Sequence, residues 1–186
     1  MKSEDIKRFL FEENWIEAPL YHNNKGKTIR FDLVPKLKKE RKKLINQMIS
    51  DLFPLQEKFF VVFYGTIEFP WREGKKYCKA SKLERITEKA FETKLEDPGD
   101  EGYHCVVCSI KRKYFNFRRF FRDYLRDDGC QMAFFNQEKT VIQFYDSRGF
   151  DVLSNNKEFL KELYKKYEKD VIEYNRLEII EALGLI

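Results

Sequence analysis

Hydrophobic and polar residues alternate from Thr28 to Val34, a pattern typical of a strand with one buried face. Ile29, Phe31 and Leu33 fall on one side of this segment and polar residues on the other. Pro35 then opens a segment in which positions recur at three- and four-residue steps before Pro54: Leu37, Arg41, Leu44, Ile45, Met48, Ile49 and Leu52, all apolar except Arg41. This spacing predicts an amphipathic helix whose basic residues lie mostly opposite the apolar stripe.

The same patterns predict further elements along the chain. Helices are expected at Ser3 to Asn14, Ser81 to Leu95 and Asn116 to Asp127, after a cap at Asn155 or Asn156, and from about Val171 to Leu183. Strands are expected at Lys58 to Phe69, Tyr103 to Lys111, Cys130 to Asn136, Thr140 to Asp146 and Phe150 to Leu153. Consecutive hairpins favour a single α+β domain over residues 1–186. Its sheet is expected to be mostly antiparallel or mixed, with about five to six strands flanked by helices.

Composition is consistent with a well-filled core. The chain has 186 residues, of which 42% are hydrophobic and 16% aromatic, a content that excludes intrinsic disorder. Four cysteines are too few for a disulfide scaffold of this length. The longest apolar run, Phe59 to Tyr64, is too short to span a bilayer, and acidic residues stand near the N-terminus where a secretory signal would be apolar. We therefore expect a cytoplasmic protein that does not enter a membrane.

The net charge of +5 is concentrated in two segments. Lys25 to Lys43 holds nine basic and two acidic residues, and Lys111 to Arg126 holds seven basic residues and one acidic residue. Such a field attracts an acidic protein or a phosphate backbone, although solvated helix faces are often charged in the same way. The candidate basic patch consists of Lys36, Lys39, Lys43, Lys111, Arg112, Lys113, Arg118, Arg119 and Arg122.

The segment from Lys111 to Arg119 interleaves basic and aromatic residues, as a groove for single-stranded nucleic acid does. Its helical part, however, places Phe117, Phe120, Phe121 and Tyr124 on one side, where they are better explained as core. Tyr114, Phe115 and Trp71 remain as candidate stacking residues. Nucleic-acid binding is therefore an alternative to protein binding.

Motifs for catalysis or metal binding are scarce. Cys105 and Cys108 have a zinc-like spacing, but an apolar strand would point them to opposite faces. The chain has two histidines, no Gly-rich phosphate loop and no nucleophile elbow. We therefore expect no metal and no cofactor, and the sequence favours a binding protein over an enzyme.

The C-terminal third carries the most specific motif. Tyr145-Asp146-Ser147-Arg148-Gly149-Phe150-Asp151-Val152, the pair Tyr164 and Tyr167, and Tyr174-Asn175-Arg176 resemble the bacterial family of the domain of unknown function 3885. Thr28 to Leu33 also resembles an early strand of that family. The resemblance covers most of the chain, and the family-like C-terminal part spans about residues 103–183. Ser147 and Asn175 depart from the family pattern, which has Asp at both positions. If those acids serve catalysis or metal binding in relatives, this chain is a poor catalyst.

The hairpin at residues 145–151 allows two interpretations. In the structural one, Arg148 forms a charge-assisted bond to Asp146, Asp151 or Glu173 and holds the turn against the last helices. In the functional one, Arg148 binds an anion in a pocket lined by Tyr145 and Tyr174. The candidate binding residues are Tyr145, Asp146, Arg148, Asp151, Tyr174 and Arg176.

These observations favour a non-catalytic protein-binding module with an acidic partner, similar in role to immunity proteins or antitoxins. Two alternatives remain open: a nucleic-acid-binding protein that uses the basic patch, and an enzyme with a carboxylate and arginine site at the hairpin. The oligomeric state does not follow from the sequence.

Overall fold

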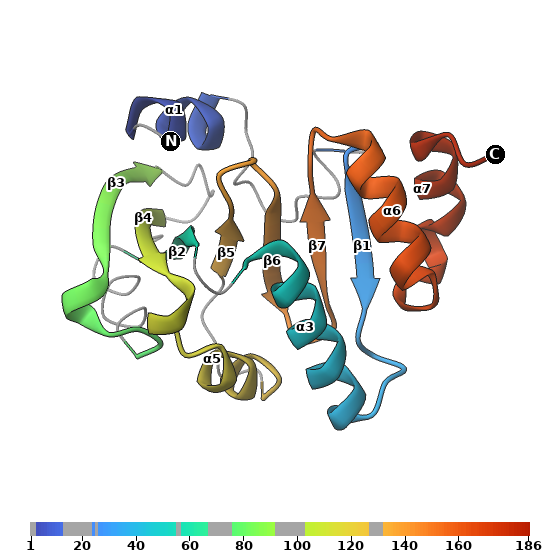
Figure 1. The fold of residues 1–186 in the computed structure, drawn as a ribbon, viewed down its shortest axis with the longest axis horizontal. Coiled ribbons are helices and arrows are strands. Elements are labelled where there is room, and N and C mark those ends of the chain that lie inside the picture. The colour runs from blue at the N-terminus through green and yellow to red at the C-terminus, as the bar shows by residue number, and fades with distance from the viewer. Residues whose placement is uncertain are drawn as a thin grey trace, which may run out of the picture.

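Strand pairing organises the molecule. In the computed structural model, residues 3–12, 24, 26–54, 57–66, 76–91, 103–126 and 132–186 are described, and their strands form one seven-stranded sheet in the order β1-β7-β6-β5-β2-β4-β3 (Figure 1). All the strand pairs are antiparallel. The strands are β1 (Thr28–Asp32), β2 (Lys58–Thr66), β3 (Glu84–Phe91), β4 (Tyr103–Lys111), β5 (Met132–Phe135), β6 (Val141–Asp146) and β7 (Gly149–Leu153). The protein is therefore α+β, as predicted.

Helices connect and cover these strands. They are α1 (Ser3–Lys7), which continues as the π-helical turn η1 (Arg8–Glu12), and then α3 (Lys38–Leu52), α5 (Phe117–Tyr124), α6 (Lys157–Tyr167) and α7 (Arg176–Leu183). Short 3₁₀ turns are η2 (Ala80–Lys82), η3 (Arg112–Tyr114), η4 (Glu168–Asp170) and η5 (Glu173–Asn175). Asn156 caps α6, as expected, by accepting a hydrogen bond from the Phe159 amide at 3.0 Å. No helix in the described part of the chain has both the length and the apolar character needed to cross a bilayer.

The last predicted helix begins at Arg176 and not near Val171, and a second error in the sequence prediction explains the strand count. Of the segment expected to be a helix from Ser81 to Leu95, the described residues 81–91 hold the end of the turn η2 and the edge strand β3, which raises the number of strands from the expected five or six to seven. Residues 92–95 lie outside the described part of the chain. Glu, Lys and Ala in this segment favour a helix locally. Pairing with β4, from Glu84 opposite Ser109 to Phe91 opposite Tyr103, overrides that preference. Charged residues on an edge strand also discourage pairing with other chains.

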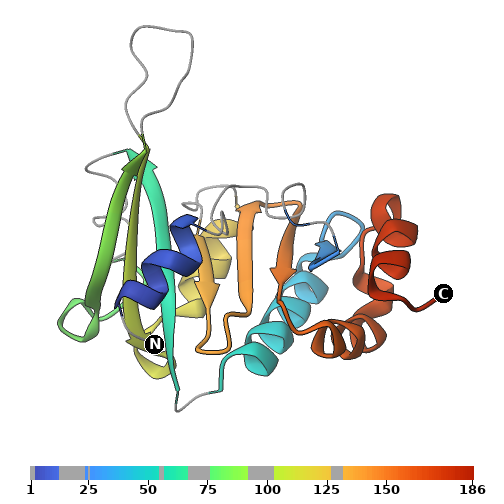
Figure 2. The same ribbon diagram turned by 90° about the horizontal axis from the view of Figure 1, so that it is seen from above.

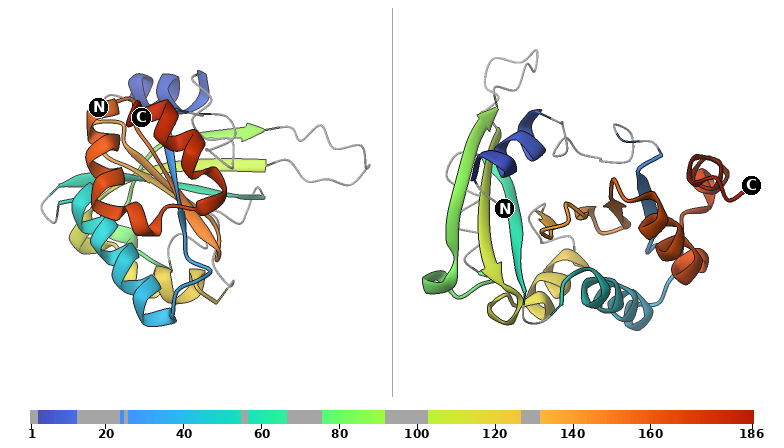
Figure 3. Two further views of the ribbon diagram at one scale, coloured as in Figure 1. Left: turned by 90° about the vertical axis from the view of Figure 1, so that its right-hand side faces the viewer. Right: turned by 45° about the horizontal axis from the view of Figure 1, so that its top comes forward.

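Three helices, α3, α5 and α6, cover one face of the sheet, and α7 packs beside α6. Leu44, Ile45 and Met48 of α3, Phe120 of α5 and Leu160 of α6 are buried in a single apolar cluster with the side chains of that face. Ile179 and Leu183 of α7 belong to the same cluster. The views of Figure 3 show α5, α3 and α6 side by side along this face. Their opposite sides are therefore turned to solvent.

The other face of the sheet is covered differently. Ile6, Phe9 and Leu10 of α1 and η1 pack with a second apolar cluster that includes Phe60 of β2 and Phe135 of β5. Figure 2 shows α1 lying across the strands at the β2–β4–β3 end. The Phe60 and Phe135 rings stack with their centroids 4.6 Å apart. The apolar cluster covers only part of this face. On β1 and β7 the same face carries the polar residues Arg30 and Asp151, which are described below.

Candidate functional site

Positive charge is concentrated on α3, η3, α5 and α6. These four segments carry fourteen basic and five acidic residues, whereas the rest of the chain carries more acidic than basic residues. Since all four lie on the same side of the sheet, their outward surfaces form one strongly positive surface. We call this surface the basic face.

Local sequence orients these basic side chains. In α5, Asn116 caps the helix by accepting a hydrogen bond from the Arg119 amide at 2.9 Å. The buried residues Phe120, Phe121 and Tyr124 form one side of this short helix. Arg118, Arg119 and Arg122 are therefore exposed on the opposite side. The amphipathic pattern of α3 does the same for Lys39 and Lys43, which are also exposed.

Four members of the predicted basic patch have partners within the protein. Lys36 forms an ion pair with Asp170 at 2.7 Å. Arg119 and Arg122 both pair with Asp123, at 3.9 and 2.8 Å. The fourth member, Arg112, donates from its guanidinium to the Phe53 carbonyl at 2.5 Å and to the Ser50 hydroxyl at 3.0 Å. It satisfies carbonyl and hydroxyl groups at the C-terminal end of α3, and burial lowers its pKa.

The remaining members are more available to a partner. Among the described residues, Lys39, Lys43 and Arg118 form no hydrogen bond or ion pair through their charged groups, and all three are exposed. Lys111 is also exposed, and Lys113 lies over the ring of Tyr114, 5.1 Å from its centroid. Solvated charges of this kind steer an oppositely charged partner toward a surface.

The aromatic residues near these basic side chains are largely turned inward. Phe115 is buried and packs edge-on against Phe134, with the ring centroids 5.3 Å apart. Phe117 is half-buried against the same core. Tyr114 is half-buried, and the Lys82 ammonium lies 5.7 Å from its ring centroid. Trp71 lies outside the described residues. In the described part of this surface, therefore, charge is far more accessible than aromatic rings.

A groove of about 610 Å³, lined by residues with polar or charged groups, lies on the basic face between α3 and α6. Asp51 accepts a hydrogen bond from the Tyr167 hydroxyl and forms an ion pair with Lys166 at 2.7 Å. Burial, and then the hydrogen bond to Asp51, raise the pKa of Tyr167 well above its ordinary value. The phenol therefore stays protonated and links the two helices, and Lys43 lines the same groove.

The hairpin residues occupy two settings. Arg148 is exposed, and its backbone carbonyl accepts a hydrogen bond from the Leu33 amide at 2.8 Å. Asp151 is fully buried, and its carboxylate forms a two-pronged ion pair with Arg30, at 2.9 Å to Nε and 3.1 Å to Nη2. The backbone of Tyr145 and Asp146 belongs to β6, and their side chains lie outside what the structure describes.

Arg30 was not among the candidate residues derived from the sequence. The sequence feature that could have identified Arg30 is its position on the polar side of an alternating strand. In the structure this side of β1 lies next to the side chain of Asp151 on β7. The next strand, β6, places the buried Gln143 opposite Asp151. Two segments that carry the family resemblance, 121 residues apart, therefore meet in one buried ion pair.

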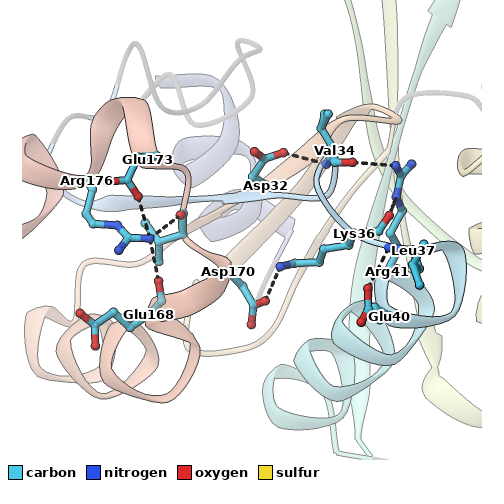
Figure 4. Close-up of polar contacts among 11 residues, drawn as sticks. Asp32, Val34, Lys36, Leu37, Glu40, Arg41, Glu168, Asp170, Glu173 and Arg176 are labelled. Carbon is cyan, nitrogen blue, oxygen red and sulfur yellow. Dashed lines mark hydrogen bonds and ion pairs between the residues drawn. The ribbon is translucent and has the colours of Figure 1, made fainter.

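The candidate residues of the C-terminal segment lie along the outer edge of β1. Arg176 pairs with Glu173 at 3.1 Å and donates to the carbonyls of Glu168 and Val171 (Figure 4). Val171 in turn forms a β-bridge with Phe31. Arg176 thus fastens the η4–η5 turns beside the sheet, while Tyr174 is 92% exposed.

Cys105 and Cys108 are placed as the strand pattern predicted. Cys105 and Cys108 of β4 belong to the two apolar clusters on opposite faces of the sheet. Burial raises the pKa of Cys108 to about 12, which keeps this thiol protonated and unreactive. Within the described ranges, no group of three or more His, Cys, Asp or Glu residues is arranged to hold a metal ion.

Comparison with family models gives a match to "Domain of unknown function (DUF3885)" over residues 5–175. Searches of curated proteins and of solved structures found no match. The match extends from α1 to η5 and includes both the basic face and the Arg30–Asp151 ion pair.

Proposed function

The chain belongs to the DUF3885 family, and from this premise we propose that it is a non-catalytic, cytoplasmic protein-binding module. Its partner is a protein with an acidic surface, which docks on the basic face. The supporting observation is the concentration of fourteen basic residues against five acidic ones on α3, η3, α5 and α6. An immunity-like or antitoxin-like role, in which docking occludes the partner's site, is the form of this proposal that we favour.

The burial of aromatic rings on the basic face favours a protein partner over single-stranded nucleic acid. Base stacking requires accessible aromatic rings, and it contributes about 1–3 kcal/mol per base. On the basic face Phe115 is buried, and Phe117 and Tyr114 are half-buried. Complementary charge alone, in contrast, is sufficient to steer association between proteins.

The test measures binding to two polyanions of equal charge by fluorescence anisotropy. The probes are a labelled glutamate peptide and a labelled oligothymidylate. We expect the glutamate peptide to bind at about 50 mM salt and to weaken steeply by about 200 mM, because each neutralised charge releases counterions. Oligothymidylate that binds more tightly by about tenfold would favour the nucleic-acid alternative instead.

Two charge-reversed triple variants locate the binding surface. Lys39→Glu/Lys43→Glu/Arg118→Glu alters three exposed residues of the basic face. Lys27→Glu/Lys79→Glu/Lys169→Glu makes the same change in net charge with exposed lysines of other segments. We expect the first variant to lose peptide affinity by about tenfold or more and the second to lose much less. Equal losses would show that net charge, and not this face, drives binding, and would refute the proposal.

A further inference from the structure

Few large apolar side chains are exposed in the described part of the chain. They are Val34, Leu37, Tyr174, Leu177 and Ile186, with exposed fractions of 56, 74, 92, 70 and 81%. Val34 and Leu37 stand three residues apart in the loop between β1 and α3, residues 33–37, which we call the anchor loop. Single exposed apolar residues are ordinary, so the significance of this pair depends on how the loop is held and on what surrounds it.

Carboxylates of the neighbouring segments accept hydrogen bonds from backbone amides of the anchor loop (Figure 4). The Asp32 carboxylate accepts a hydrogen bond from the Val34 amide at 2.8 Å. The Glu40 carboxylate accepts one from the Leu37 amide at 2.8 Å, at the start of α3. Both amides next to the exposed side chains are therefore fixed in direction.

Two basic side chains, Arg41 and Lys36, also restrain the loop. The Arg41 guanidinium donates to the Lys36 carbonyl at 2.8 Å and to the Val34 carbonyl at 3.0 Å. The Lys36 ammonium forms an ion pair with Asp170 at 2.7 Å, which ties the loop to the C-terminal segment. Pro35 restricts the backbone further. The polar groups of the loop are thus turned to the protein, and the two apolar side chains are presented to solvent on a restrained backbone.

The anchor loop leads directly into the basic face. Leu37 is followed by Lys38 and Lys39, and both are exposed. A pre-organised apolar side chain loses little conformational freedom on binding, and such anchors dominate the affinity of protein interfaces. Charged residues around the anchor then select a partner of opposite charge.

We propose that Val34 and Leu37 form the apolar anchor of the interface, and that they insert into an apolar pocket with an acidic rim on the partner protein. This inference rests on the proposed function, because the basic face determines the charge of the rim. It adds the position at which apolar contact occurs and the shape of the site that the partner must offer.

Leu177 and Ile186 supply a matched control. They are as exposed as Val34 and Leu37, but they lie on α7 and just after it, near Glu178 and Glu181 and outside the basic face. An acidic partner docked on the basic face has no electrostatic reason to approach them. The double variant Leu177→Ser/Ile186→Ser therefore removes a similar amount of exposed apolar surface at another place.

The experiment uses a phage-displayed library of random twelve-residue peptides, selected on the whole wild-type protein. We expect enriched peptides in which apolar residues are flanked by Asp and Glu. Synthetic copies are then measured by anisotropy against Val34→Ser/Leu37→Ser, against the Leu177→Ser/Ile186→Ser control and against Lys39→Glu/Lys43→Glu/Arg118→Glu. The anchor variant should lose affinity by about tenfold or more, and the control should retain it. Both serine variants should unfold at the wild-type temperature, because the substituted side chains are exposed.

The outcomes separate the two proposals. A library that yields no peptide dependent on Val34 and Leu37 overturns the anchor. If its peptides nevertheless lose affinity for the charge-reversed variant, the acidic-partner function stands without the anchor. Peptides that depend on Val34 and Leu37 but tolerate charge reversal overturn the acidic rim and the proposed function together.

Discussion

The two faces of the sheet bury their residues by different means. Toward α3, α5 and α6, strands β1, β2, β4, β5, β6 and β7 all contribute apolar side chains to one cluster. On the opposite face the apolar cluster lies mainly on β2, β4 and β5, under α1 and η1. There β1 and β7 contribute the Arg30–Asp151 ion pair.

The two faces therefore contribute differently to the fold: one mainly to its stability, the other to the specificity of strand pairing. Apolar burial stabilises a face roughly in proportion to its area, with little dependence on the partner residue. An ion pair across two strands depends on register, because a slip of one residue would turn Asp151 to the other face. We therefore interpret the helical side as the main source of stability and the ion pair as a constraint on how β1 pairs with β7.

Phe134→Ala should produce the largest effect, a loss of about 3–5 kcal/mol in the free energy of unfolding. Phe134 lies among the rings of Phe53, Phe59, Phe115, Phe120 and Phe144 on the helical side. Phe135→Ala is the matched change, since the adjacent Phe135 is equally buried on the other face against Phe9 and Phe60. Urea denaturation of both variants measures the difference, and an equal or larger loss for Phe135→Ala would contradict the comparison.

Breaking the ion pair should have the next largest effect. Asp151→Ala leaves the Arg30 guanidinium without its carboxylate, at an expected cost of about 3 kcal/mol. This lies at the low end for buried pairs because Arg30 keeps 12% of its side-chain exposure. In a double-mutant cycle, Arg30→Met/Asp151→Leu should cost clearly less free energy of unfolding than the sum of the losses for Arg30→Met and Asp151→Leu measured singly. Additive losses would show that the two charges do not depend on each other.

The smallest effect concerns pH and the α3–α6 contact. The folded pKa of Tyr167 lies above its ordinary value of 10.0, so the folded protein keeps a proton that the unfolded chain releases above that pH. The stability contributed by this tyrosine is thus complete below pH 10 and is lost as the pH rises toward the folded value. Tyr167→Phe should therefore show a shallower alkaline loss of stability in urea denaturation between about pH 9 and 10.5.

Tyr164 serves as an internal control for that experiment. Burial also raises its pKa, and it is present in both the wild type and Tyr167→Phe. The difference between the two pH profiles therefore belongs to Tyr167 and its bond to Asp51. Parallel profiles would show that the phenol proton of Tyr167 does not contribute to stability.

Elements with a strong local period were predictable from the sequence. The strand from Thr28, the helix ending at Leu52, and the hairpin between β6 and β7 are all present. The edge strand β3 was not predictable in this way, because its composition favours a helix and only β4 supplies the competing hydrogen bonds. The basic residues were likewise identifiable, but the role of Arg112 at the end of α3 required the approach of two segments 59 residues apart.

The sequence by itself determined which side of each amphipathic segment is apolar, because the periods of helix and strand place those residues on one side. It therefore determined that most of the basic residues of α3 and α5 point to solvent. Only the tertiary structure decided that these helices share one face of the sheet, that Arg30 meets Asp151 and that β3 is a strand. Each of these facts depends on contacts between distant segments, and the pattern of a single segment does not specify which other segment it will contact.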